Sequence, residues 1–317
     1  MNLELRIRGD SLSIDGQSIA IPAELLGDHG IELSSNIFGQ FLSRVVYLVA
    51  HKRVNYDDHL ARYAKMSAFT YGDARYESLL KLCCDFKTWR DDGWLLKEVR
   101  KNGQFIVRKK GTELALRIPA EMVCGAPLFP EKGEPISMHS PCFRPYLSPG
   151  YLFIISPFGG PSSTNGLARV YLNCTPQGAC RVLMDISRFA RANSLRFHAK
   201  FRNNPTHYLS SDSGVIYLST EDFDRLRDPL VELLSAHIAH YNDRTSYFTK
   251  ILLPGVSMAT EMPSNRGSVK SYGEIRAADY AAAALHKALG SGLVTESAPS
   301  MSAVSHKGSE LINVARD

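Results

Sequence analysis

The sequence predicts an α+β protein with a mixed sheet in its C-terminal half and a helical, hairpin-containing N-terminal part. The segment L-R-F-H-A-K-F-R-N at 195–203 alternates basic and apolar residues, which is typical of a strand. The segment A-R-V-Y-L-N-C at 168–174 alternates in the same way, and the residues between the two segments have helical periodicity. With 317 residues and 44% apolar content, the chain can form a large core, as one extended domain or two ordinary ones.

The N-terminal third is predicted to form a β-hairpin and three helices. The segment L-E-L-R-I-R-G-D-S-L-S-I has strand character on both sides of a turn at Gly9 and Asp10. Asn36 is a suitable cap for a helix that carries a continuous apolar stripe. Two further helices are predicted near 56–66 and 76–89.

The middle of the chain changes to strand periodicity and then to a proline-rich stretch. The apolar pattern has period two over 93–119, with Gly111 at a turn. Five prolines fall in 125–148, a pattern that indicates a domain boundary or a long functional loop. The division we expect is an N-terminal region 1–124, a connector 125–148, an α/β domain 149–290 and a disordered tail 291–317.

A strand, helix, strand unit is predicted around the two alternating segments. Thr175 followed by Pro176 is a helix-start signal, and apolar residues then recur at helical spacing. Such a crossover makes its two strands parallel and covers their apolar face with the helix. The polar residues then face the opposite way, and if the strands are adjacent they form one patch. Its members are Arg169, Tyr171, Asn173, Arg196, His198, Lys200 and Arg202.

The charge pattern favours an anion as the ligand of this patch. Seven Lys and Arg residues but a single acid, Asp185, lie between Arg169 and Arg202. Because the net charge of +5 is mild and its excess is concentrated, a discrete anionic group is a better partner than bulk nucleic acid. Two alternatives remain open: a solvated strand face that protects a sheet edge, and a basic surface that binds RNA.

The remaining C-terminal segments add two basic candidates. The glycine-rich stretch P-F-G-G-P-S-S-T-N-G is a loop but lacks the Gly-Lys-Ser/Thr of a phosphate-binding P-loop. A strand V-I-Y-L is followed by a helix that starts at Ser219 or Thr220. Lys250 lies in or beside a further strand. Arg276 falls in or near the first turn of an Ala-rich helix, where the backbone favours an anion.

Several classes of protein are disfavoured. The six cysteines include no C-x-x-C pair and no spacing typical of zinc, so we expect neither a metal site nor a disulfide framework. The start M-N-L-E-L-R-I-R-G-D lacks the apolar region of a signal peptide. The longest apolar runs are too short to span a bilayer. We therefore expect a cytoplasmic protein without membrane contacts.

Five short motifs in the second half carry a family resemblance. They are R-V-Y-L-N with T-P-x-G, K-F-R-N-N-P followed by Tyr208 and Asp212, V-I-Y-L, F-T-K with L-x-P-G-V, and S-Y-G-E-I-R. In this order they resemble the plant-pathogen type III effectors of the HopA class. They are similar in particular to the bacterial relatives that act as phosphoserine and phosphothreonine lyases in class V lanthipeptide pathways. The resemblance covers about 93–286 and is strongest from Arg169 to Arg276.

The resemblance implies a cofactor-free lyase that removes phosphate from a phosphorylated precursor peptide and leaves dehydroalanine or dehydrobutyrine. It also implies a partner kinase, which supplies the phosphate, and a cyclase. Removal of the Cα proton needs a base, and the leaving phosphate needs cations and a proton donor. Lys200 is the expected base, and His198 or Tyr208 the expected proton donor. The expected phosphate ligands are Arg169, Arg196, Lys250 and Arg276, with Tyr171 and Asn173 as hydrogen-bond donors.

The chain departs from the family pattern at Phe201 and Arg202. We therefore expect Arg202 to be a surface charge outside the site. The alternative to a lyase is a type III effector without enzymatic activity, or a protein that binds phosphopeptides or RNA.

Overall fold

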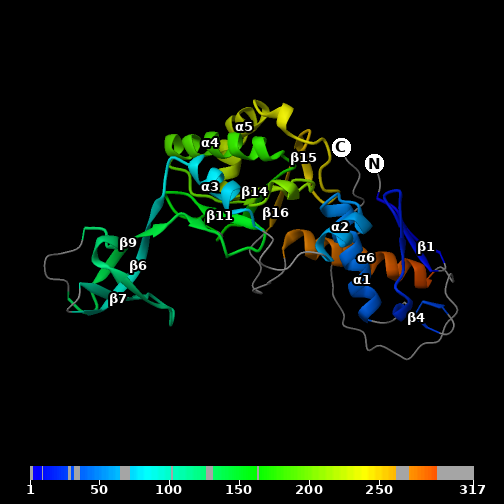
Figure 1. Cartoon of the computed structure of the whole chain (residues 1–317), viewed down its shortest axis with the longest axis horizontal. Coiled ribbons are helices and arrows are strands. Elements are labelled where there is room, and N and C mark those ends of the chain that lie inside the picture. The colour runs from blue at the N-terminus through cyan, green and yellow to red at the C-terminus, as the bar shows by residue number, and fades with distance from the viewer. Residues whose placement is uncertain are drawn as a thin grey trace.

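The protein forms a row of three structural parts, shown in Figure 1. The computed structural model describes residues 3–8, 10–27, 30–31, 36–64, 72–100, 103–125, 131–162, 164–261 and 271–290. A small sheet lies at one end, a seven-stranded sheet under two long helices lies in the middle, and the N-terminal strands and helices lie at the other end. The prediction of an α+β fold is confirmed.

The central sheet has the strand order β10-β11-β13-β14-β12-β16-β15, and each of these ladders is antiparallel. The strands are β10 (Phe143–Arg144), β11 (Tyr151–Ile155), β12 (Leu167–Leu172), β13 (His198–Arg202), β14 (Gly214–Ser219), β15 (Lys250–Leu253) and β16 (Val256–Glu261).

The two alternating strands are not neighbours, which corrects the patch expected from the sequence. Helix α4 (Pro176–Asn193) joins β12 to β13, and both strands run antiparallel to β14. They therefore point in the same direction, but β14 lies between them and hydrogen-bonds to both. Two strand spacings, about 10 Å, separate their backbones.

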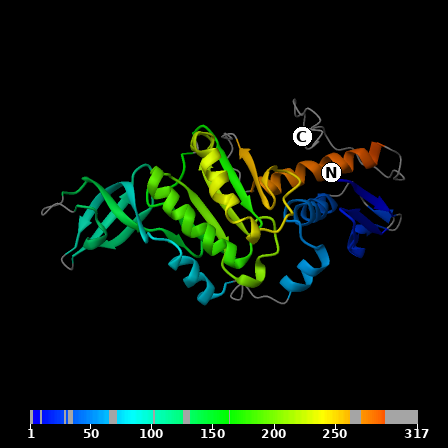
Figure 2. The same cartoon turned by 90° about the horizontal axis from the view of Figure 1, so that it is seen from above.

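Helices α4 and α5 (Thr220–Ser235) cover one face of the sheet and lie side by side in Figure 2. Thr175 caps α4 as predicted, accepting a hydrogen bond from the Gly178 N–H at 3.1 Å, and Ser219 caps α5. The predicted alternation is also confirmed. The buried core on the helical side includes Val170, Leu172, Leu195, Phe197, Ala199, Phe201, Val182, Leu183 and Ile186.

A four-stranded sheet with its own core occupies one end of the molecule. Its strands, in the order β8-β7-β6-β9, are β6 (Thr88–Val99), β7 (Gln104–Lys109), β8 (Ala115–Pro119) and β9 (Pro135–Pro141). Helix α3 (Ala74–Leu82) ends before the predicted 76–89 helix does, because Trp89 already belongs to β6. The expected connector 125–148 contains β9 and β10. Pro135 and Pro141 are compatible with a strand because each stands at an end of β9.

The N-terminal part combines a three-stranded meander with helices from both ends of the chain. Helix α6 (Tyr272–Gly290) packs against α1 (Asn36–Val46), and α1 continues into a π-helix, Tyr47–His51. Helix α2 (Tyr56–Ala64) follows. The strands are β1 (Leu5–Arg8), β2 (Ser11–Ile14), β3 (Gln17–Ala20) and the short pair β4 (Leu26–Gly27) and β5 (Gly30–Ile31). The two strands of the expected hairpin, β1 and β2, pair as predicted, and β3 pairs with β2 as a third strand.

None of the described helices has the length and apolar character that crossing a membrane requires. The tail predicted over 291–317 lies outside the described residues.

The close contact between Gly214 and Phe201 provides a test of the β13–β14 pairing. A Cβ atom on Gly214 would lie 2.6 Å from Cε1 of the buried Phe201 ring. We expect Gly214→Ala to lower the free energy of unfolding by about 1–3 kcal/mol, measured by denaturant titration, because the ring has no space to move. Gly39→Ala in α1 is the control, since nothing lies within 4 Å of its Cβ position, and it is expected to be neutral or slightly stabilising. Equal effects at both positions would contradict the packing.

Candidate functional site

The candidate site lies on the sheet face opposite α4 and α5. On this face Lys200 stands between Phe153 of β11 and Val215 of β14. Val215 is in turn aligned with Tyr171 of β12, and Arg169 is aligned with Tyr217 of β14. The polar residues of β12 and β13 therefore share a face, as predicted, but a residue of β14 separates them.

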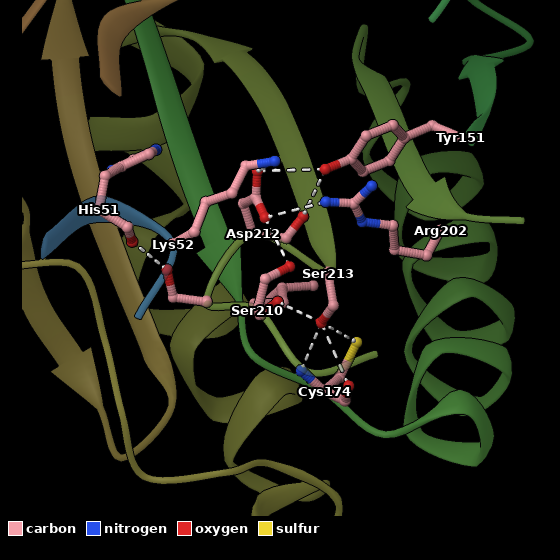
Figure 3. Close-up of polar contacts among 10 residues, drawn as sticks. His51, Lys52, Tyr151, Cys174, Arg202, Ser210, Asp212 and Ser213 are labelled. Carbon is pink, nitrogen blue, oxygen red and sulfur yellow. Dashed lines mark hydrogen bonds and ion pairs between the residues drawn. The ribbon is translucent and has the colours of Figure 1, made fainter. Parts of the chain in front are cut away.

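A buried carboxylate, Asp212, is the centre of the polar contacts on this face (Figure 3). The Ser210 hydroxyl donates to its Oδ1 at 2.7 Å, and the Tyr151 hydroxyl donates to its Oδ2 at 3.1 Å. Lys52 Nζ lies 4.0 Å from Oδ2, and Arg202 Nη2 lies 3.5 Å from Oδ1. Three segments far apart in sequence thus converge on one carboxylate.

The turn that carries Asp212 is anchored to the end of β12. The Ser213 hydroxyl accepts a hydrogen bond from the Cys174 N–H at 2.9 Å and donates to the Leu172 carbonyl at 2.8 Å. Burial raises the pKa of Asp212, but the positive charges of Lys52, Arg202 and Lys200 outweigh burial and hold that pKa well below its usual range. Asp212 is therefore an anion at neutral pH.

An irregular backbone presents Lys52 to this carboxylate. The π-helix Tyr47–His51 immediately precedes Lys52, and Arg53 follows with a left-handed φ of 60°. Single π-helical turns occur frequently at functional sites. The Ser211 N–H donates to the Lys52 carbonyl at 2.9 Å, and the Tyr247 N–H donates to the Ala50 carbonyl at 3.1 Å. Backbone hydrogen bonds at Ala50 and Lys52 therefore fasten this segment to the loops that precede β14 and β15.

The environment of Lys52 favours its neutral form more than water does. Burial lowers the pKa of Lys52 to about 8, with Arg202 and Lys200 acting in the same direction and Asp212 opposing them. An ordinary lysine is protonated almost completely at neutral pH, whereas about one Lys52 in ten is neutral at pH 7. A neutral amine is a proton acceptor.

A basic pocket opens beside Lys52, with a cavity volume of about 210 Å³. Among the described residues that line it, five are Lys or Arg and only Asp58 is acidic. A concave surface with such an excess of positive charge attracts anions, and arginine forks suit phosphate oxygens. The lining consists of Lys52, Arg53, Val54, Asn55, Asp58, His59, Arg62, Arg202, Leu209, Ser210 and Arg244.

Lys200, the predicted base, lies next to the Asp212 cluster. Its Nζ is 4.7 Å from the centroid of the Tyr151 ring and 6.0 Å from that of Tyr217, within the range of cation–π attraction. Within the described part of the chain, no carboxylate oxygen lies within 4.0 Å of Nζ. Lys200 therefore contributes positive charge that no nearby carboxylate neutralises directly.

Three other predicted residues surround the same face. Arg169 forms an ion pair with Glu261, and its guanidinium lies 5.6 Å from the Tyr217 ring centroid. Tyr171 is buried beneath His51, with ring centroids 5.3 Å apart. Arg276 lies 5.5 Å from the ring of Tyr272, a side chain that packs against the cluster containing Tyr171.

Asn173 and Tyr208 have structural contacts instead of the expected roles. The Asn173 amide nitrogen donates to the Arg244 carbonyl at 2.7 Å, and its oxygen accepts from Asn242 at 3.1 Å. Asn173 therefore fixes the loop that carries Arg244. The Tyr208 hydroxyl donates to the Arg202 carbonyl at 2.7 Å, and its ring packs in the core on the helical side. Tyr208 does not face Lys200, so the expectation of a proton donor is corrected.

The structure also separates Lys250 and Arg196 from the predicted patch. Lys250 is aligned with Met258 and, through it, with Val170, whose side chain faces the helices. Lys250 is therefore exposed on the edge strand β15, on the helix-covered side of the sheet and not on the side of Lys200. Arg196 precedes β13 and lines a second cavity, away from Asp212.

The structure corrects the expectations for His198 and Arg202 as well. Burial and the nearby Arg196 lower the pKa of His198 to about 4, so the imidazole is neutral at pH 7 and is not a ready proton donor. Arg202, expected at the surface, is buried because Asp212 pairs with it.

Sequence reasoning missed the contributions of Lys52, Arg62 and Arg244. Lys52 follows His51 and precedes Arg53, and this run of three basic residues was the one local signal for it, which sequence reasoning did not use. Arg62 and Arg244 belong to distant segments, α2 and the loop after α5, with no pattern that relates them. In the described ranges no three His, Cys, Asp or Glu side chains group as metal ligands.

Comparisons with known proteins give a family match. The model described as the HopA1 effector protein family matches residues 142–309, more than half of the chain. The structure is similar to the effector protein from Pseudomonas syringae pv. tomato strain DC3000, with a TM-score of 0.38 and 12% identity, over 83% of this chain and 86% of that one. It is also similar to the effector protein from Pseudomonas syringae pv. syringae strain 61, with a TM-score of 0.35 and 10% identity, over 79% and 93%. No curated protein matches the chain.

Replacement of Asp212 tests the central ion cluster. We expect Asp212→Asn to lower the free energy of unfolding by about 3–5 kcal/mol at pH 7, because Lys52 and Arg202 lose their buried counter-charge. Since the folded-state pKa of Asp212 is depressed, its stabilisation is present above the unfolded pKa and declines as pH falls below about 4. Denaturant titrations at pH 7 and pH 3 should therefore show a smaller difference between wild type and variant at the lower pH. The exposed Asp228→Asn on α5 is the matched control, and equal effects of the two substitutions would contradict this assignment.

Proposed function

The chain belongs to the HopA1 effector protein family, and from that premise we propose that it is a lyase acting on phosphoserine or phosphothreonine in a peptide. The observation that carries the proposal is the basic pocket, in which four arginines adjoin a buried lysine of lowered pKa. The resemblance of the sequence motifs to phosphoserine and phosphothreonine lyases supports the same reaction. A partner kinase supplies the phosphopeptide, and a cyclase consumes the dehydrated product.

The reaction is a β-elimination. The base takes the proton from Cα, the electron pair of that C–H bond forms the Cα=Cβ double bond, and the Cβ–Oγ bond breaks. Phosphate leaves with the electrons of the broken bond, so the products are a dehydroamino acid, phosphate and the protonated base. Negative charge grows on the leaving oxygen, and positive side chains already in place lower the energy of that state.

The pocket supplies groups for each part of this step. Arg62, Arg202 and Arg244 bind the phosphate, and their charges offset the increase in lysine pKa that a bound dianion causes. Lys52 takes the Cα proton. Asp212 is a positioning residue, because it holds Lys52 and Arg202 through ionic contacts.

Two lysines lie close to Asp212, Lys52 and Lys200, and each is a candidate for the base that takes the Cα proton. We assign the base to Lys52 because it lines the pocket and because burial lowers its pKa. Lys200 then acts as a fixed positive charge on the adjoining strand, which favours binding of the anionic substrate.

The reaction is tested by the intact mass of a phosphopeptide after incubation with the protein. We expect a loss of about 98 Da, the mass of phosphoric acid, because elimination removes phosphate together with the Cα proton. A loss of about 80 Da indicates hydrolysis and contradicts the lyase. Binding without any mass change would instead support an effector that recognises phosphopeptides without chemistry. Steep salt dependence without dependence on phosphorylation would indicate RNA binding.

The base is tested by Lys52→Arg and Lys200→Arg, which keep the positive charge but remove a usable proton acceptor. We expect Lys52→Arg to lower kcat by at least about 100-fold while phosphopeptide binding persists, and Lys200→Arg to retain most of kcat. For the wild type, kcat/KM should rise with pH and level off above about 8, because neutral Lys52 accumulates as pH increases through its pKa. The reverse ranking of the two variants would assign the base to Lys200.

A further inference from the structure

A second cavity, of about 290 Å³, is lined by residues of the four-stranded sheet and of the segments next to β11 and β13 of the central sheet. It is separate from the basic pocket and shares no lining residue with it. Its wall is formed by residues of β6, of β7, of the loop after β11 and of the segment that precedes β13. The lining residues are Trp89, Arg90, Asp91, Asp92, Lys109, Phe158 and Arg196.

The charges of this cavity are paired except at one position. Lys109 Nζ lies 2.5 Å from Asp91, and Arg90 Nε lies 2.9 Å from Asp92. Among the described residues no carboxylate oxygen lies within 4.0 Å of the Arg196 guanidinium. The cavity therefore has one exposed cation that is available to a carboxylate from outside.

Aromatic side chains flank this cation. Phe158 is 41% exposed, which is unusual for a large apolar side chain, and Trp89 forms the adjoining wall. The loop after β11 passes close to Trp89 and Arg196 at Gly159, where φ is 95°. A Cβ added to Gly159 would lie 3.5 Å from the Trp89 ring and 3.6 Å from Arg196 Nη2. An arginine beside two aromatic rings suits a carboxylate carried on a short aliphatic stem.

The two cavities lie near opposite ends of one extended segment. Leu195 and Phe197 are buried toward the helices, so Arg196 is on the same side as Lys200 and Arg202. Arg202 lines the basic pocket and Arg196 lines the second cavity. The two arginines are six positions apart in extended chain, a span of about 20 Å at about 3.3 Å per residue. A bound peptide in extended conformation covers that span with the same number of residues.

We propose that the second cavity binds an acidic side chain of the peptide substrate, about six residues away from the phosphorylated residue. The identity of the ligand as the same peptide rests on the proposed function, whereas the carboxylate site itself does not. Recognition at two separated anionic groups gives specificity that a phosphate alone does not provide, because a peptide must match both positions.

The test uses fluorescently labelled phosphoserine peptides with a single Glu placed from about two to about ten residues away on either side. Anisotropy titrations at fixed salt give Kd for each peptide and for its Gln counterpart. We expect the tightest binding near a separation of about six residues, with a weakening of about 5–10-fold when that Glu becomes Gln. Arg196→Gln should abolish this preference. Arg227→Gln, an exposed arginine on the helical side, is the control and should keep it.

The outcomes separate this inference from the proposed function. Binding that is indifferent to Glu position, or equal in wild type and Arg196→Gln, overturns the second site even if the phosphopeptide loses phosphate. A preference for Glu that depends on Arg196, with no change in peptide mass, supports the second site and contradicts the lyase. Circular dichroism and thermal unfolding of both arginine variants confirm that they are folded; both positions are exposed, so wild-type stability is expected.

Discussion

The ion cluster around Asp212 is the constraint on which the candidate site depends. A carboxylate at 4% exposure is stable as an anion only if positive and hydrogen-bonding partners replace the water that it has lost. Those partners are Lys52, which directly follows the π-helix, Arg202 of β13 and Tyr151 of β11. The cluster therefore connects the N-terminal part of the chain to the central sheet at the place where the basic pocket opens.

The same cluster explains why the pocket remains basic. One buried carboxylate faces several cations, so its charge compensates only part of theirs, and Asp58 is the one acid among the described lining residues. Burial then lowers the pKa of Lys52 while the arginines stay charged at any physiological pH. One site thus combines permanent cations, which suit a phosphate, with a lysine that can exchange a proton.

The central sheet has a different role on each face. Toward α4 and α5 the sheet buries a continuous apolar core that includes Phe197 and Phe201. This packing makes β13 rigid. Toward the other face the same strand presents Lys200 and Arg202 at intervals set by the backbone. Because the core restrains the strand, Arg202 in one cavity and Arg196 near the other keep a constant separation.

The sequence by itself determined which residues of β12 and β13 face the core, where α4 and α5 begin, and that basic side chains share one face. These are local properties, since strand alternation and helix capping depend on neighbours a few residues apart. Only the tertiary structure decided that β14 separates the two strands, that Arg202 is buried beside Asp212, and that Lys52 enters the site. Strand order and buried ion pairs join residues that lie far apart in the chain, and their energies depend on desolvation and on partners that no local pattern specifies.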